Sequence, residues 1–217
     1  MRYDLIIFDC DGVLVDSEVI SCQVHAEMLT AHGYPISAED VHARFLGRSA
    51  RAARDEVEAE LGHPLPEAYG TEIRALMTRR FTELLQPVAA IHETLAALTL
   101  PMCVASSGTL ERVQSSLRIT ALHDRFAPHI FSATQVRHGK PAPDLFLFAA
   151  AQMAVPAARC LVIEDSVPGI TGARAAGMTV FGFHGGSHCR PDEAARLQQA
   201  GAEATFNDMR QLPGMIQ

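Results

Sequence analysis

Short apolar runs recur along the chain and end in glycine or polar residues, which predicts the strands of one sheet. The first run is Leu5-Ile6-Ile7-Phe8, and two acids, Asp9 and Asp11, follow it closely. A continuous apolar run of this length, rich in Ile and Phe, is typical of a strand buried on both faces, as in a parallel sheet. Four later segments predict further strands: 102–105, 130–132, 160–163 and 178–183.

The residues between these runs show helical periodicity. From Ser17 to Gln86 the chain is helical throughout, with Ile20, Val24 and Met28 on one face of the first helix. After residue 87, strands alternate with helices expected over 92–98, 109–117, 143–153 and 166–176. Such alternation indicates a parallel sheet with helices on both faces. We therefore expect an α/β fold, a doubly wound Rossmann-like core formed by residues 1–16 and 87–217, with an inserted α-helical cap domain over residues 17–86.

The composition and charge of the chain limit the kinds of protein to which it can belong. The 217 residues are 48% hydrophobic and 20% charged, so the chain can bury a sizeable core. A net charge of −7 argues against a nucleic-acid partner. The number of cysteines, five, is odd, and no two of them have the spacing of metal ligands. We therefore expect reduced thiols. No signal peptide and no membrane-spanning run are evident. We expect a cytoplasmic protein, a monomer or weak dimer, with no membrane partner.

Polar residues suited to catalysis follow four segments of the predicted core. Each of these four groups, taken alone, also has a purely structural explanation. A serine can cap a helix, a lysine can lie in a solvated loop, and acids are common in turns. Parallel strands present their carboxyl ends at one edge of the sheet, where ligands bind. Two neighbouring acids there repel each other, and a divalent cation such as Mg²⁺ would hold them. The four groups are Asp9 with Asp11, Ser106 with Ser107 and Gly108, Lys140, and Glu164 with Asp165.

These groups lie in four motifs that resemble those of the haloacid dehalogenase superfamily. The first motif spans residues 8–17, the second 105–108, the third 139–144 and the fourth 163–170. The similarity covers the whole chain, including a helical insert after the first strand. Within the superfamily, the chain resembles β-phosphoglucomutase-like phosphatases, and among these the 6-phosphogluconate phosphatase type.

The resemblance implies a phosphatase that forms an aspartyl-phosphate. Asp9 would be the nucleophile, and Asp11 the general acid and later the base. Lys140 would neutralise the nucleophile and the transferring group. Mg²⁺ would be held by the carboxylates of Asp9 and Asp165 and the carbonyl of Asp11, with Glu164 acting through a water. Because Asp11 follows the nucleophile by two residues, dehalogenase activity is not expected.

The resemblance also implies where a phosphate ester binds. Ser106 and the backbone N–H groups near Ser107, Gly108 and Gly12 would contact the phosphoryl oxygens at a helix N-terminus. The loop at residues 47–49 resembles the substrate-specificity loop of the family, and Arg48 is the best-placed cation in it. Arg51 and Arg54 are expected on a solvated helix face.

We expect the substrate of such a phosphatase to be a small sugar phosphate or sugar-acid phosphate. Two other functions remain open, those of a phosphomutase and of a non-catalytic binding protein. A phosphomutase would carry an arginine and a histidine where this chain has Ala50 and Ser21, which disfavours it. A non-catalytic binding protein has no need for the full set of acids, serine and lysine. A phosphonate-cleaving enzyme is excluded, because no lysine lies between residues 17 and 86. The glycine-rich stretch 185–191 is expected to be a surface turn rather than a substrate contact.

Overall fold

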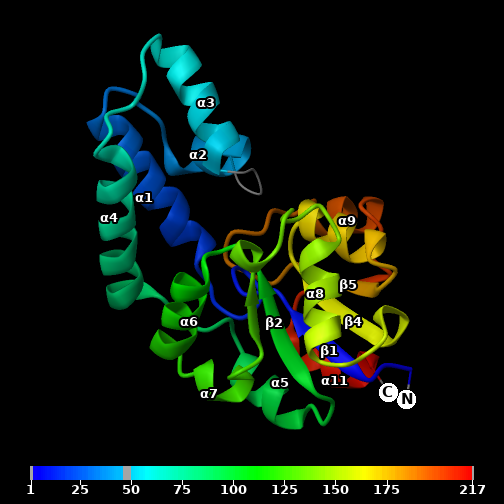
Figure 1. Ribbon diagram of the computed structural model, residues 1–217. Coiled ribbons are helices and arrows are strands. Elements are labelled where there is room, and N and C mark those ends of the chain that lie inside the picture. The colour runs from blue at the N-terminus through cyan, green and yellow to red at the C-terminus, as the bar shows by residue number, and fades with distance from the viewer. Residues whose placement is uncertain (1, 46–49, 217) are drawn as a thin grey trace. The chain divides into compact units, whose positions relative to one another are not determined.

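A computed structural model describes residues 2–45 and 50–216, and Figure 1 shows its elements in chain order. The chain divides into two units. The first consists of Met1–Asp16 and Gln86–Gln217, and the second of Ser17–Leu85. The first contains the whole sheet, and the described part of the second contains only helices and their connections. That the second unit acts as a cap stays a prediction.

The core is built on a six-stranded sheet with the order β3-β2-β1-β4-β5-β6, and every neighbouring pair is parallel. This is the order of a doubly wound sheet. The strands after β1 are added first on one side of it, as β2 and β3, and then on its other side, as β4, β5 and β6. The predicted fold class is confirmed. The strands are β1 (Leu5–Phe8), β2 (Met102–Ser106), β3 (Ile130–Ser132), β4 (Cys160–Glu164), β5 (Thr179–Phe183) and β6 (Ala204–Phe206).

The register of the central strands brings their carboxyl ends to one level. Phe8 pairs with Val104 of β2 and with Ile163 of β4. These three residues are followed by Asp9, Ala105 and Glu164. The first acid after β1 therefore lies beside the last residue of β4. The sequence thus places its polar residues at the edge where such sheets bind ligands.

Successive side chains of β1 point to opposite faces of the sheet. Leu5 and Ile7 belong to a buried cluster with residues of α8, α9 and α10. On the other face the ring of Phe8 meets that of Phe126 in α7, with centroids 5.9 Å apart. In Figure 1, α8 and α9 lie over β1, β4 and β5. The core helices are α5 (Ile91–Ala97), α6 (Leu110–Ile119), α7 (His123–Phe126), α8 (Asp144–Gln152), α9 (Val167–Ala175), α10 (Glu193–Gln199) and α11 (Leu212–Met215).

The second unit contains four helices in its described part. The Oγ of Ser37 accepts a hydrogen bond from the backbone N–H of Asp40 at 3.0 Å, so Ser37 caps the second helix. Arg44 joins this helix to the third through Glu56 and Glu60, at 2.8 and 2.5 Å. The helices are α1 (Glu18–Ala31), α2 (Ala38–Phe45), α3 (Ala50–Leu61) and α4 (Tyr69–Leu84).

The predicted core elements up to Phe183 are present with ends within two residues of those expected. The sequence did not predict β6, α7, α10 or α11. β6 has only three residues and α7 and α11 only four each, which leaves too few positions to show a periodicity. The five cysteines are free. In the described residues, no helix has the length and apolar character needed to cross a membrane.

Candidate active site

Asp9 and Asp11 follow β1 where the chain makes a tight turn. The backbone N–H of Asp9 still donates to the carbonyl of Ile163, at 3.0 Å, which continues the pairing with β4. Gly12 has a φ of +76°, a conformation that favours glycine. A Cβ on Gly12 would also lie 1.8 Å from Oδ2 of Asp165, so this glycine lets the fourth motif approach the first. The N–H of Gly12, predicted to bind a phosphoryl oxygen, donates to Val15 at 2.8 Å.

Lys140 lies at the centre of the candidate site and is almost fully buried. Its Nζ donates to Oδ1 of Asp9 at 2.6 Å, to Oε1 of Glu164 at 2.6 Å and to the carbonyl of Ala105 at 2.9 Å. Burial by itself lowers the pKa of Lys140, but the two carboxylates outweigh burial and raise the pKa above its usual value. The lysine is therefore a fixed positive charge between the acids of the first and fourth motifs.

Glu164 is completely buried, and both of its carboxylate oxygens accept hydrogen bonds. Oε1 accepts from Lys140, while Oε2 accepts from the N–H groups of Asp165 and Ser166, at 3.1 and 3.0 Å, and from Oγ of Ser166, at 2.9 Å. Gly169 of α9 allows this arrangement, because a Cβ there would lie 1.8 Å from the Glu164 carboxyl carbon. Glu164 thus anchors Lys140 to the start of α9.

The carboxylates of Asp9, Glu164 and Asp165 form a buried group whose oxygens lie within 4.8 Å of one another. Burial raises the pKa of Asp9 well above its usual value; Lys140 lowers it, and the neighbouring carboxylates raise it further. The lysine alone therefore does not offset the burial and crowding of these acids, and a second positive charge would favour the ionised form of Asp9. A hard divalent cation fits a donor set made only of oxygens.

Asp165 has a second partner that the sequence did not predict. Nε2 of His188 lies 3.1 Å from Oδ2 of Asp165, and both side chains are less than a tenth exposed. Burial lowers the pKa of His188, but the hydrogen bond with Asp165 outweighs it and raises the pKa to about 11. The stretch 185–191 was expected to be a surface turn, which is wrong for His188. Ser187 beside it binds Oδ1 of Asp16 through its N–H, at 3.1 Å, and its Oγ, at 2.8 Å.

The second motif connects the end of β2 to the start of α6. Ser106 is fully buried at the end of β2, and its Oγ accepts from the N–H of Gly108 at 3.1 Å. The side chain that caps α6 belongs to Thr109, which accepts from the N–H of Arg112. The alternative in which Ser106 is the helix cap is therefore wrong. Ser107 is exposed beside this helix start, where anions bind to backbone N–H groups.

Arg112 contacts the second acid of the first motif and was also not predicted. Its Nη1 and Nη2 donate to Oδ1 and Oδ2 of Asp11, at 2.9 and 2.5 Å. No sequence motif identifies Arg112, because it lies in an ordinary amphipathic helix about a hundred positions from its partner. Arg48 and the loop at 47–49 lie outside the described residues, so the role predicted for Arg48 stays a prediction. Arg51 is 92% exposed and pairs with Asp55 of its own helix, as expected for a solvated face.

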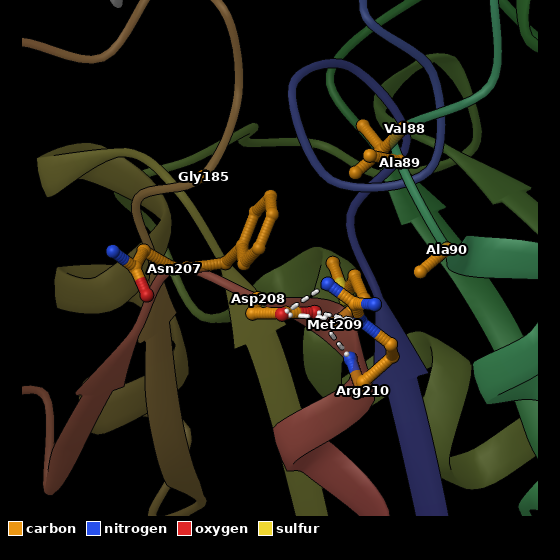
Figure 2. A pocket seen from close by; sticks show the side chains of 9 residues that line it. Val88, Ala89, Ala90, Gly185, Asn207, Asp208, Met209 and Arg210 are labelled. Atoms are coloured by element: carbon orange, nitrogen blue, oxygen red, sulfur yellow. Dashed lines mark hydrogen bonds and ion pairs between the residues drawn. The ribbon is translucent and has the colours of Figure 1, made fainter.

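A separate cavity of about 300 Å³ lies near the ends of β5 and β6 (Figure 2). Its charged side chains, Arg210 and Asp208, form an ion pair with each other at 2.7 Å. Among the described residues that line this cavity there is none of the predicted catalytic, phosphate-binding or metal-binding residues. The lining residues are Val88, Ala89, Ala90, Phe183, Gly185, Asn207, Asp208, Met209 and Arg210.

The sheet order, the buried lysine between two motifs and the acid group together agree with the family that the motifs resemble. Residues 3–177 match the haloacid dehalogenase-like hydrolases. The chain belongs to this family. The predicted enzyme class, a phosphoric monoester hydrolase of the haloacid dehalogenase type, is confirmed.

Relatives of this family align along nearly the whole chain. A protein of Escherichia coli (strain K12) named 6-phosphogluconate phosphatase is 34% identical over 214 residues, covering 98% of this chain and 94% of the relative. A Thermotoga maritima protein named phosphorylated carbohydrates phosphatase is 30% identical over 206 residues, covering 93% of each chain. The structure of a conserved haloacid dehalogenase-like protein of unknown function from Agrobacterium tumefaciens str. C58 is similar with a TM-score of 0.88, at 44% identity, covering 99% of this chain and 97% of that one.

Proposed function

We propose that the protein is a Mg²⁺-dependent phosphatase that hydrolyses a small sugar phosphate or sugar-acid phosphate through an aspartyl-phosphate at Asp9. The observation that carries this proposal is the contact of Lys140 with both Asp9 and Glu164, beside a third carboxylate. It joins a nucleophile, a cation and a metal-binding group at the ligand-binding edge of the sheet. The names of the two curated relatives support a phosphorylated carbohydrate as the substrate.

In the first step, an oxygen of Asp9 attacks the phosphorus and the bond to the leaving oxygen breaks. Asp11 donates its proton to that oxygen, so the leaving group departs as a neutral alcohol. Lys140 stays at Asp9 and offsets negative charge that develops around the transferring group. Ser106 and the N–H groups at the start of α6 bind the phosphoryl oxygens.

In the second step, Asp11 removes a proton from water, and the water oxygen attacks the phosphorus of the aspartyl-phosphate. The bond to Asp9 breaks, inorganic phosphate leaves, and the carboxylate of Asp9 is restored. Mg²⁺ would be held by the carboxylates of Asp9 and Asp165 and the carbonyl of Asp11, with Glu164 nearby. When bound, it supplies positive charge to the phosphoryl oxygens and to the acid group.

The test is phosphate release from a panel of sugar phosphates and sugar-acid phosphates, with Mg²⁺ and with EDTA. The wild type should release phosphate and dephosphorylated product in equal amounts, only with metal. Asp9→Asn should lose this activity, while Asp4→Asn, which changes an exposed acid paired with Arg159, should keep it. Sustained turnover by Asp9→Asn would refute the assigned nucleophile, and an isomeric phosphate ester as the main product would indicate a mutase instead.

A further inference from the structure

The two acids of the first motif have different partners. Asp9 belongs to the carboxylate group with Glu164 and Asp165, and in the described residues that group does not include Asp11. Asp11 is instead paired with Arg112 through both of its oxygens, at 2.9 and 2.5 Å. The side chain of Asp11 is 14% exposed and that of Arg112 is 34% exposed. The carboxylate of Asp11 is thus mostly buried, while Arg112 keeps about a third of its side chain in water, and burial of the acid strengthens the charge-assisted contact.

The local structure of α6 directs Arg112 towards this carboxylate. Arg112 is in the first turn of the helix, and its N–H donates to the capping side chain of Thr109. Gly108 provides the space that the guanidinium occupies, because a Cβ there would lie 2.4 Å from Nη2. A guanidinium offers two parallel donors in a rigid plane, so it fixes both the position and the orientation of a carboxylate.

We propose that Arg112 is a positioning residue that fixes the carboxylate of Asp11 in one orientation, outside the metal-binding group. This inference rests on the proposed function, in which Asp11 is the acid and base. A carboxylate two residues from Asp9 would otherwise be attracted to a divalent cation.

Two substrates with different leaving groups test this role. An alkyl phosphate such as glycerol phosphate needs a proton on its leaving oxygen, whereas p-nitrophenyl phosphate needs little help. The ratio kcat/KM reports steps up to the loss of the leaving group. General acid catalysis contributes about 10²–10⁴-fold, so Arg112→Met should lower kcat/KM for the alkyl ester by about 10²-fold and for the nitrophenyl ester by less than about threefold.

Two further variants make the result specific. Arg112→Lys keeps the positive charge but not the two parallel donors of the guanidinium. Its kcat/KM for the alkyl ester should lie between those of Arg112→Met and the wild type. It also serves as the second variant if Arg112→Met does not fold. Arg118→Met is the matched control, because Arg118 is exposed at the other end of α6. This substitution should leave kcat/KM unchanged for both esters.

An equal loss of kcat/KM for both esters would overturn the proposal, because it would indicate a structural role or a direct contact with the phosphoryl group. A rise in KM confined to esters that carry a second anionic group would also overturn it, because Arg112 would then bind substrate. A wild type that hydrolyses neither ester would refute the proposed function itself, which is a different result from either of these.

Discussion

Gly169→Ala is the most direct test of how tightly the candidate site is packed. Gly169 is the third residue of α9, and a Cβ there would lie 1.8 Å from the carboxyl carbon of Glu164 and 1.9 and 2.2 Å from its oxygens. Glu164 is completely buried and accepts four hydrogen bonds, one of them from Lys140. A displaced carboxylate cannot keep its bonds on both oxygens.

The expected loss of stability follows from these contacts. Each hydrogen bond to a charged group contributes about 1.5–3 kcal/mol, so losing two costs about 3–6 kcal/mol. Replacing glycine by alanine within a helix returns about 1 kcal/mol. Gly169→Ala should therefore lower the free energy of unfolding by about 2–5 kcal/mol.

Urea unfolding followed by circular dichroism measures this change. With a slope of about 2 kcal/mol per molar urea, the midpoint should fall by about 1–2.5 M. Gly214→Ala is the matched control, because Gly214 is also the third residue of a core helix and a Cβ there meets nothing within 4 Å. A midpoint for Gly169→Ala equal to or above that of Gly214→Ala would refute the reasoning.

Three other predictions test separate parts of the chain. His188→Asn should weaken Mg²⁺ binding by about 10–100-fold, because His188 orients Asp165; calorimetric titration measures this, and unchanged affinity would contradict it. Phe126→Ala should lower the free energy of unfolding by about 3–5 kcal/mol, because its ring is buried against Phe8; a loss below about 1 kcal/mol in urea unfolding would contradict this packing. Burial lowers the pKa of His25 below its usual 6.5, so the unfolded chain binds this proton more readily. Between about pH 7.5 and about pH 5.5, stability should therefore fall more in the wild type than in His25→Gln, and equal losses would contradict this.

The sequence predicts the central part of the fold because the physical signals there are local. Four apolar runs of four to six residues can form little other than buried strands, and the polar residues after them must meet at one edge once the strands are parallel. The contact of Lys140 with Asp9 and Glu164 is a consequence of that topology. Each residue lies at a strand end or in a loop between a strand and a helix, and the register places them together.

Arg112 and His188 could not be predicted in the same way. Arg112 is one of several arginines on amphipathic helices, and its contact with Asp11 depends on where the turn after β2 places the first turn of α6. His188 lies in a glycine-rich segment whose composition is typical of a surface turn, and its burial depends on Gly12 and Gly186, where a Cβ would lie 2.9 and 2.7 Å from the imidazole. Side-chain partners that depend on helix packing and on close backbone approach have no periodic signal in the sequence.

The pairing of the acids indicates how one short motif can carry two kinds of chemistry. Asp9 and Asp11 are identical side chains two positions apart, and their intrinsic acidity does not distinguish them. Their partners do, because Lys140 and the fourth motif surround Asp9, while the fork of Arg112 binds Asp11. A nucleophile must remain a carboxylate in a crowd of acids, which requires fixed positive charge. In the proposed mechanism Asp11 exchanges a proton with the leaving group and with water, and Arg112 holds its carboxylate apart from the acids around Asp9. On this argument the helix that follows the second motif has a role of its own in our proposal, since it supplies the residue that fixes the second acid of the first motif.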